Sequence, residues 1–433
     1  MSAENGTCTN NRKRNDDVTC CEGTTIVILI LVGSGIAALG VWALLWFFQD
    51  IFVAPEIVTP EIVTTIPFTS TTTTTQMPTT TTTTSIPTTT KPPSCKKRIV
   101  GFFNETDTRE IETRQLSKLT HAVFAHLVIT WEGDLEIESK QTGEDRLKGL
   151  VTAARGVATD LKVMASIVGS KTDFFNISKK TSYRKNFASS VIKKLEYYGI
   201  DGVDLQWEKE TFSDNHLKLL GELRQRLNEK GRSYIISITI PAPPISESNF
   251  NLTGILKHAD FLNIVSMKYH DLEGTRTAPI SPLYSNSGNK LNVDATMDSF
   301  VCKTKEPLKF NIVIPFFVRL WNNVEMDSEK NHYFRYSPEK FEEVPRDSVT
   351  ENASWDEASK SSFVYDESKS TFLSFEDVKS IEAKVDYVNR MNLGGVWIWM
   401  VEMDENRRLL NAVKNDEFFC RDGSEDIIKF KCD

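Results

Sequence analysis

The sequence is poor in cysteine and histidine, and several common catalytic motifs are absent from it. Seven cysteines in 433 residues are too few for a disulfide-stabilised scaffold. The six histidines show no H-E-x-x-H or comparable metal-binding spacing, and the sequence has neither a G-x-S-x-G nucleophile motif nor a phosphate-binding loop. We therefore expect no metal and no nucleotide cofactor. Acidic residues outnumber basic ones, 59 to 51, which argues against a general nucleic-acid-binding protein.

Charge is also absent from residues 24–48. At 1.5 Å per residue, a helix of this length crosses the roughly 30 Å hydrocarbon core of a bilayer. The segment is too long for the apolar core of a signal peptide, and no convincing cleavage site follows it. Basic residues at 12–14 precede it, so the positive-inside rule predicts a single-pass type II membrane protein with a cytosolic tail, residues 1–23. The lipid bilayer is then a partner through 24–48.

Residues 49–97 contain little that could form a hydrophobic core. Threonine and proline dominate this segment, and such a composition stays extended. We interpret it as an O-glycosylated extracellular stalk, and a bare disordered linker is the alternative. In both interpretations it is a spacer that holds the following domain, residues 98–415, away from the membrane.

The domain at 98–415 and the C-terminal tail at 416–433 carry signs of the secretory pathway. Four N-glycosylation sequons fall here, with acceptors at Asn104, Asn176, Asn251 and Asn352. The domain would therefore be extracellular or lumenal. Four cysteines lie in or next to this zone, at Cys95, Cys302, Cys420 and Cys432. Three pairings are possible; Cys420 with Cys432 would close a short loop, but the sequence does not decide between them.

Short apolar runs alternate with amphipathic segments throughout this domain. The runs predict eight strands, at 98–103, 121–129, 162–167, 202–207, 234–241, 261–267, 309–317 and 395–401. Helical periodicity is clear in 183–198 and 215–230. Strands rich in Val, Ile and Phe that alternate with helices favour a parallel sheet with both faces covered. The length suits a (β/α)8 barrel with a small insertion before the eighth strand.

One predicted strand alternates polar and apolar residues. Strand side chains point to opposite faces with period two, so Asp204, Gln206 and Glu208 share one face while Val203 and Leu205 share the other. In a barrel the apolar face packs against the helices and the polar face points inward. The carboxyl end of a barrel strand is where catalytic residues lie. We therefore predict a functional site here; the alternative, an edge strand with a solvated face, has no place in a closed barrel.

The same strand carries a family resemblance. Asp201, Asp204 and Glu208 resemble three acidic positions of the D-x-x-D-x-D-x-E motif of glycoside hydrolase family 18, the chitinases and chitinase-like lectins. The segment 355–405 resembles the last insertion, helix and eighth strand of that family. Trp399 falls where the family keeps a tryptophan under the reacting sugar. The resemblance implies a barrel that binds chitin or chitooligosaccharides.

The resemblance also implies a substrate-assisted reaction. Glu208 is the expected acid; after it protonates the glycosidic oxygen, the substrate's own acetamide attacks the anomeric carbon and an oxazolinium ion forms. An aspartate two residues before the acid holds the acetamide N–H, and a tyrosine in the M-T-Y-D motif of the sixth strand holds its oxygen. The expected sugar-contacting residues are Trp399, Met267, Lys268, Arg319, Trp321 and Asp201.

This chain departs from the family pattern around the acetamide. Gln206 stands in place of the assisting aspartate, and Met267 and Lys268 stand in place of the tyrosine and aspartate of M-T-Y-D, while Arg319 and Trp321 are kept on the seventh strand. Gln206 supplies no negative charge, and one such preorganised contact is worth on the order of 3 kcal/mol. If Lys268 points inward, its cation disfavours the oxazolinium ion and keeps a neighbouring acid ionised.

Three hypotheses follow from these residues. The first is a membrane-anchored chitinase-like protein that binds N-acetylglucosamine-containing glycan with little or no hydrolysis. Trp399, Trp131 and Trp321 are its candidate stacking platforms, with core packing as the alternative for each. The second is an active or slow chitinase of family 18 that uses Glu208 as acid. The third is a scaffold or interaction ectodomain without a glycan ligand, since a fold alone does not imply a function. The oligomeric state and the length of the glycan stay open.

Overall fold

The structure is a computed structural model. It describes residues 97–157, 160–206, 214–242, 250–269, 277–285, 291–326, 334–335, 341–345, 349, 353–404, 407–413, 430 and 432. The predicted tail and membrane segment, nearly all of the predicted stalk and most of 416–433 lie outside these residues. No helix among the described residues is both long and apolar enough to cross a bilayer. Because 24–48 is not among them, the membrane anchor stays a prediction.

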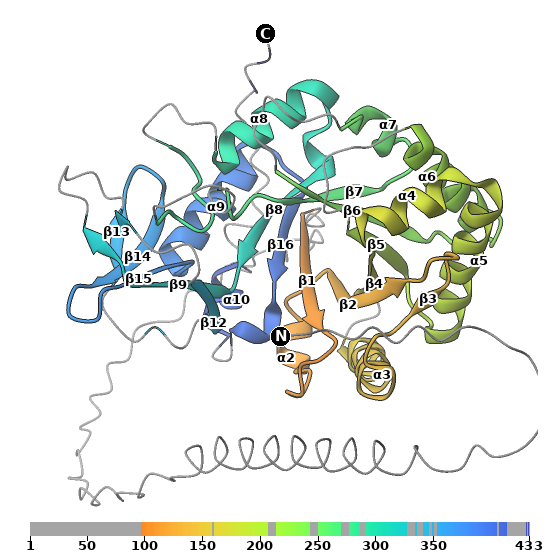
Figure 1. The fold of residues 1–433 in the computed structure, drawn as a ribbon, viewed down its shortest axis with the longest axis horizontal. Helices are drawn as coiled ribbons and strands as arrows, with labels where there is room; N and C mark the ends of the chain where they lie inside the picture. Colours follow the sequence, from red (N-terminus) through yellow and green to blue (C-terminus); the bar gives the residue numbers. More distant parts are fainter. Residues whose placement is uncertain are drawn as a thin grey trace, which may run out of the picture. The chain divides into compact units, whose positions relative to one another are not determined.

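Eight parallel strands form a closed barrel at the centre of Figure 1. In order around the ring they are β1 (Arg98–Asn104), β2 (His121–Ile129), β4 (Lys162–Val168), β5 (Gly202–Gln206), β6 (Ile235–Pro241), β7 (Phe261–Val265), β8 (Phe310–Pro315) and β16 (Gly395–Trp399). Strand β1 pairs with both β2 and β16, which closes the ring. A two-residue strand, β3 (Leu135–Glu136), pairs with β2 in antiparallel fashion. The predicted barrel is confirmed.

Helices surround the barrel (Figure 1). They are α2 (Thr113–Leu116), α3 (Lys140–Val157), α4 (Lys171–Lys179), α5 (Thr181–Tyr198), α6 (Asp214–Asn228), α7 (Leu252–Leu256), α8 (Val293–Thr304), α9 (Val378–Arg390) and α10 (Arg408–Val413). Two short 3₁₀ helices are η2 (Pro307–Lys309) and η4 (Val401–Met403). Helices α5 and α6 match the two predicted helices. Leu219, Leu220, Leu223 and Leu227 form the buried stripe of α6, as its helical period requires.

The alternation of β5 sorts its side chains as predicted. Val203 and Leu205 are fully buried in the large cluster between the strands and the helices. Asp204 and Gln206 point the other way, into the barrel. There a second apolar cluster fills the interior below the mouth, with Phe102 and Trp397 among its largest members. The polar residues of β5 therefore lie at the top of a packed barrel core.

An antiparallel sheet is inserted between β8 and the last barrel strand. Its strands run in the order β12 (Phe341–Pro345), β9 (Phe317–Asn322), β15 (Thr371–Phe375), β14 (Ser361–Asp366) and β13 (Ser354–Asp356). A small hairpin, β10 (Glu325–Met326) with β11 (Phe334–Arg335), lies between β9 and β12 in the chain. The insertion before the eighth strand is thus confirmed. It lies to one side of the barrel in Figure 1.

The seventh predicted strand, 309–317, needs a correction. Barrel strand β8 ends at Pro315, and the chain from Phe317 onward belongs to β9 of the inserted sheet. Within the part of the chain that the structure describes, strand β9 pairs with β12 and β15 and with no barrel strand. Arg319 and Trp321 therefore lie in the insertion and not on the seventh strand of the barrel.

A disulfide links Cys302, near the end of α8, to Cys432 near the C-terminus. The short Cys420–Cys432 loop considered from the sequence is therefore wrong. Cys302 lies on a barrel helix, 130 residues before Cys432 in the sequence. The spacing of the cysteines therefore did not predict this pairing. Cys95 and Cys420 lie outside the described residues.

Candidate functional site

Asp204 is the centre of a buried polar network inside the barrel. Its side chain is fully buried. Its carboxylate accepts hydrogen bonds from the hydroxyls of Ser237 (2.6 Å), Thr239 (2.9 Å) and Ser166 (3.2 Å), and from the amide of Asn263 (3.1 Å). Burial raises the pKa of Asp204 despite these four donors. The network fixes the orientation of the carboxylate and supports the strand that carries Gln206.

The network continues to the opposite end of the barrel. The Asn263 side-chain oxygen accepts from the amide of Asn311 (2.8 Å), whose own oxygen accepts from the Arg98 guanidinium (3.1 Å). Arg98 also lies over the ring of Phe261, with its Cζ 4.6 Å from the ring centroid. Burial lowers the pKa of Arg98 to about 10. A chain of satisfied polar groups thus runs along the barrel axis.

A pocket of about 360 Å³ opens above this network. It is lined by Gln206, Thr239, Pro241, Val265, Met267, Lys268, Trp397 and Trp399. These residues belong to β5, β6, β7, the segment just after β7, and β16. They lie toward the carboxyl ends of the strands, which is where barrel enzymes bind their substrates. Four sequence-predicted residues from three distant parts of the chain therefore meet at one cavity: Gln206, Met267, Lys268 and Trp399.

Gln206 presents an unsatisfied acceptor at this pocket. Its Oε1 is buried and has no hydrogen-bond partner among the described residues. Leaving a buried amide oxygen without a hydrogen-bond partner destabilises a protein by on the order of 1–3 kcal/mol. A ligand N–H that reached Gln206 would therefore recover that cost.

Met267 and Lys268 follow the end of β7 and form one wall. Met267 is buried, and its thioether side chain offers no strong hydrogen bond to a ligand. The Lys268 Nζ lies 5.1 Å from the centroid of the Phe317 ring. Phe317 is fully buried in the interior cluster that also contains Met267 and Trp397. The ammonium of Lys268 is therefore held on the inner side of the barrel mouth.

Trp399 is the last residue of β16 and is partly buried. Its ring contacts Phe102 in a tilted arrangement, with centroids 5.7 Å apart, and Trp397 edge to face at 6.1 Å. The His126 ring stacks against it at 5.8 Å and 30°. Burial lowers the pKa of His126 to about 4, so the imidazole is neutral at physiological pH. These rings fix the orientation of Trp399 at the pocket.

His126 is a site residue that the sequence did not reveal. The pairing of β2 with β4 shifts register between Ala125 and Leu127. Ala125 belongs to the interior cluster and Leu127 to the outer one. Simple alternation would place Ala125 and Leu127 on the same face. Because of the irregularity at His126, alternation does not predict which way the His126 side chain points. A bulge of this kind leaves no reliable signal in a single sequence.

Asp201 is not brought to the pocket. It precedes β5, at the amino end of the strand, and its carboxylate accepts from Arg155 (2.7 Å), from the backbone N–H of Val163 (2.8 Å) and from Arg232. Gln206 lies at the other end of β5. The predicted sugar contact at Asp201 is therefore replaced by a structural one: it ties α3 and the segment before β6 to the base of the strand.

Two of the predicted aromatic and basic contacts also lie away from the pocket. Trp321 packs in the inserted sheet with Val324 and Phe372 and is 4% exposed. The Cζ of Arg319 lies 5.7 Å from the Trp321 ring centroid, and Arg319 is itself buried. Core packing, the alternative considered for Trp321, is what the structure shows. Trp131 is different, since it is 66% exposed just after β2 ends.

Several predicted positions cannot be placed at the site. Glu208, the expected acid, lies two residues beyond the end of β5 and outside the described residues, as does Asn352. The other sequons lie at the last residue of β1 (Asn104), within α4 (Asn176) and at the cap of α7 (Asn251). Among the described residues, no group of three or more His, Cys, Asp or Glu side chains could hold a metal ion.

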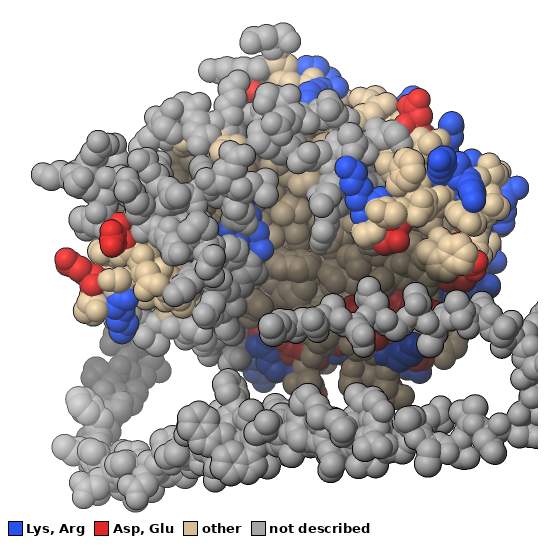
Figure 2. All heavy atoms as spheres, in the orientation of Figure 1, with Lys and Arg blue, Asp and Glu red and all other residues tan. Residues whose placement is uncertain are grey.

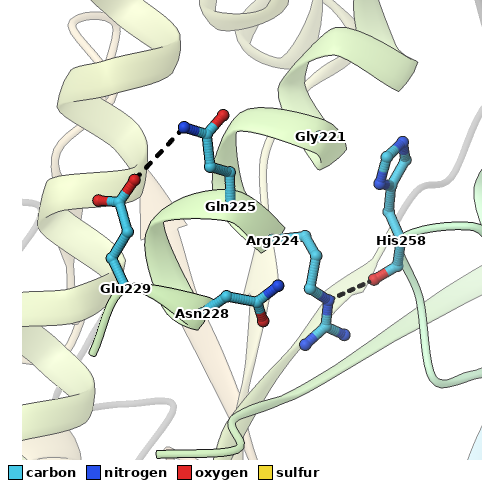
Figure 3. Close-up of a pocket in the computed structure, with 6 residues that line it drawn as sticks. All are labelled: Gly221, Arg224, Gln225, Asn228, Glu229 and His258. Carbon is cyan, nitrogen blue, oxygen red and sulfur yellow. Dashed lines mark hydrogen bonds between the residues drawn. The ribbon is translucent and has the colours of Figure 1, made fainter. Parts of the chain in front are cut away.

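A second depression lies on the outside of the barrel (Figure 3). It is lined by Gly221, Arg224, Gln225, Asn228, Glu229 and His258. Arg224 has a structural role here. Its guanidinium donates to the carbonyls of His258 (2.8 Å) and Tyr234 (2.9 Å) and pairs with Asp260 (2.6 Å). We assign this depression no function.

Comparison with known proteins shows which protein family this chain resembles. The model for "Glycosyl hydrolases family 18" matches residues 98–404. Chitinase A1 of Niallia circulans is 24% identical over 300 residues, which are 59% of this chain and 42% of that protein. Chitinase 1 of Aphanocladium album is 23% identical over 325 residues, 65% of this chain and 75% of that protein. This chain therefore spans less than half the length of the first relative.

A solved structure agrees in fold. The family 18 chitinase of Cycas revoluta, in complex with (GlcNAc)3, superimposes with a TM-score of 0.65 at 19% identity, over 73% of this chain and 98% of that one. At this identity the likeness shows the fold alone. The family model, however, covers well over half of the chain, including every strand of the barrel. This chain belongs to glycosyl hydrolases family 18.

Proposed function

We propose that this chain binds N-acetylglucosamine-containing glycans, of the chitin or chitooligosaccharide type, with little or no hydrolysis. The observation that carries the proposal is the composition of the pocket wall. Gln206, Met267 and Lys268 line it together, and they occupy the positions where family 18 enzymes hold the reacting acetamide with an aspartate and a tyrosine. The pocket is thus kept while its acetamide-activating groups are changed.

The changed groups act against the chemical step. A neutral Gln206 cannot offset the positive charge of an oxazolinium ion, and the absent anion corresponds to about a hundred- to thousandfold in rate. The Lys268 ammonium on the inner side of the mouth adds charge of the wrong sign there. These effects do not simply add, because residues that act on one transition state act as a unit. Each of them nevertheless lowers turnover.

Binding depends on other groups, which are present. The Trp399 ring, oriented by Phe102 and His126, offers a platform on which a sugar ring can stack. The buried Gln206 Oε1 is suited to accept an acetamide N–H. A mostly apolar pocket with a few fixed polar groups is the usual form of a small-ligand site. The wild-type pocket therefore suits recognition better than turnover.

The test measures binding and cleavage in the same sample. Purified full chain is titrated with chitotetraose by calorimetry, and the cell contents are then analysed for shorter sugars. We expect a binding isotherm, no shorter sugars, and a loss of binding of about tenfold or more in Trp399→Ala. Trp321→Phe, in the inserted sheet, is the matched control and should bind normally. Absence of binding, or complete conversion to shorter sugars, would refute the proposal.

A second candidate is a slow chitinase that uses Glu208 as acid. Glu208 is retained in the sequence, and the relatives described above are named chitinases. Glu208→Gln separates the two candidates. If residual cleavage of chitotetraose disappears in this variant, the chain is a slow enzyme; if an equal background remains, Glu208 has no catalytic part.

We also propose that residues 24–48 anchor the chain in a membrane as a type II protein. Support comes from their length without charge and from the basic residues at 12–14. In this arrangement residues 1–23 are cytosolic, 49–97 form the stalk, and the barrel is extracellular or lumenal. Protease treatment of sealed microsomes should remove only the N-terminal tail. Digestion of the barrel in sealed vesicles would contradict this orientation.

A further inference from the structure

We propose that the inserted sheet sets the shape of the sugar pocket, and that the buried hydroxyl of Ser374 is the positioning group through which it does so. This inference rests on the proposed glycan-binding function and adds to it a residue that controls affinity from outside the pocket. It follows from how the wall that comes after β7 is held in place.

That wall, formed by Met267 and Lys268, lies just beyond the end of β7. The described pairing of β7 with β6 ends at Val265, and its pairing with β8 ends at Ile264. Lys268 has a φ angle of +59°, a left-handed conformation that residues other than glycine rarely adopt. A backbone conformation of this kind persists only where the surrounding structure holds it. The wall therefore depends on contacts from other segments.

Residues 277–285, which we call the bridge segment, supply two of these contacts. The carbonyl of Ile280 accepts from the backbone N–H of Lys268 (2.8 Å), and the hydroxyl of Ser281 donates to the carbonyl of Ser266 (2.7 Å). Ser266 and Ser281 are fully buried. Water therefore does not compete for the second bond, and the wall follows the position of the bridge segment.

The bridge segment is bound in turn to the inserted sheet. The backbone N–H of Ile280 donates to the hydroxyl oxygen of Ser374 in β15 (2.9 Å), and that of Leu283 donates to the carbonyl of Ser359, between β13 and β14 (2.8 Å). Ser374 is fully buried. Ile280 thus binds the inserted sheet with its N–H and the pocket wall with its carbonyl. A shift of the sheet is transmitted to the wall through this one residue.

Ser374 is itself firmly held. It pairs with Arg319 of β9 on one side and with Phe363 of β14 on the other. Two residues later, Glu376 forms a buried ion pair with Lys384 of α9. The hydroxyl that receives the bridge segment is therefore fixed both by the sheet and by a barrel helix.

The outer end of the inserted sheet has a different character. Glu367 and Lys369, in the turn between β14 and β15, are exposed. Figure 2 shows acidic and basic side chains at this end of the sheet, at the left of the view. The contact at Ser374 is instead fully buried. The buried side of the sheet is therefore the side that can act on the pocket.

The opposite wall of the pocket also contacts the start of the inserted sheet. The backbone N–H of Phe316 donates to the carbonyl of Trp399 (2.8 Å), one residue before β9 begins at Phe317. Phe317 belongs to the interior cluster that contains Met267 and Trp397. Both walls are thus joined to the insertion, and a change in its seating alters the distance between them.

Ser374→Ala removes the acceptor of the Ile280 N–H and leaves that group buried. The bridge segment then has alternative positions, and the wall is correctly placed for only part of the time. The observed affinity falls in proportion to the correctly placed fraction. If that fraction falls to about one tenth, the dissociation constant for the sugar rises about tenfold.

Calorimetry with chitotetraose tests this effect on the full chain. We expect about tenfold weaker binding in Ser374→Ala, and recovery to within about threefold of wild type in Ser374→Thr, which keeps a hydroxyl acceptor. Ser362→Ala is the matched control, because Ser362 is also buried in the inserted sheet and its hydroxyl donates to Asp377 (2.7 Å). It should lower the urea midpoint to a similar extent and bind chitotetraose like wild type. A merely structural role of Ser374 would move the urea midpoint and leave the affinity unchanged.

Hydrogen exchange of the wild-type chain gives a second readout that needs no variant. Coupling between two parts of a protein is reciprocal, so bound chitotetraose should slow amide exchange in 277–285 by about threefold or more. None of these residues is among the described residues that line the pocket. This measurement decides the question if Ser374→Ala does not fold.

The inference and the proposed function fail in different ways. If wild type binds chitotetraose, then unchanged affinity in Ser374→Ala, an equal loss in Ser362→Ala, or unchanged exchange in the bridge segment would overturn the inference alone. If wild type does not bind the sugar, the proposed function fails and the inference fails with it.

Discussion

Removal of the Asp204 carboxylate tests the polar network at the heart of the barrel. Asp204→Ala deletes four hydrogen bonds, to Ser166, Ser237, Thr239 and Asn263. At about 1 kcal/mol net for each bond, the loss amounts to roughly 4 kcal/mol. Part of it returns, since the buried carboxylate no longer bears the cost of leaving water. We expect a net decrease in the free energy of unfolding of about 2–4 kcal/mol.

The pH dependence of this decrease has a definite sign. Burial raises the pKa of Asp204 in the folded state, so the folded protein holds this proton more tightly than the unfolded chain does. Stability from this group is therefore fully present below the unfolded pKa of about 3.9 and is lost as the pH rises through the raised folded value. The deficit of Asp204→Ala relative to wild type should thus be larger in acid than at neutral pH.

The assay is urea unfolding of the full chain, followed by tryptophan fluorescence at several pH values between acid and neutral. Ser237→Ala is the matched control: it deletes one of the four bonds and should cost about 1 kcal/mol. A deficit below about 0.5 kcal/mol for Asp204→Ala, or one that grows with increasing pH, would refute this account of the network.

Three further changes test other parts of the structure. Lys384→Ala leaves Glu376 buried without the partner it has in the wild-type ion pair; it should cost about 3–5 kcal/mol in urea unfolding, and Lys384→Met combined with Glu376→Leu should cost clearly less. Burial lowers the pKa of His126 to about 4, so its stabilisation is complete above the unfolded pKa of about 6.5 and is lost as the pH falls toward 4; His126→Phe should flatten the pH dependence of unfolding in that range, and an unchanged slope would count against it. Peptide mapping without reduction should recover Cys302 linked to Cys432, and loss of this bond should cost about 3–5 kcal/mol; a Cys420–Cys432 peptide would contradict the structure.

The barrel strands were predictable because each is a short apolar run between helical segments. All eight begin within one residue of where those runs predict them. The end of β8 was not predictable, since the apolar run continues through Phe316, Phe317 and Val318 while the chain leaves the barrel. The break depends on pairing with β12 and β15, which are distant in the sequence. The local pattern of apolar residues does not predict that long-range pairing.

The site was predictable in part for the same reason. Period two was enough to point Asp204 and Gln206 into the barrel. It could not show that Asp201 lies at the amino end of β5, away from the pocket. There its carboxylate pairs with two arginines, Arg155 and Arg232. It also could not place His126 beside Trp399, because the irregularity in β2 breaks the alternation.

The most direct test of the central claim restores the family residues at the three changed positions. Chitotetraose cleavage is measured for the full wild-type chain and for Gln206→Asp/Met267→Tyr/Lys268→Asp. The account predicts that the triple variant cleaves faster by on the order of a hundred- to thousandfold, while wild type binds the sugar without cleaving it. Wild-type cleavage as fast as that of the triple variant would contradict the claim, and so would a triple variant that binds the sugar and stays inert.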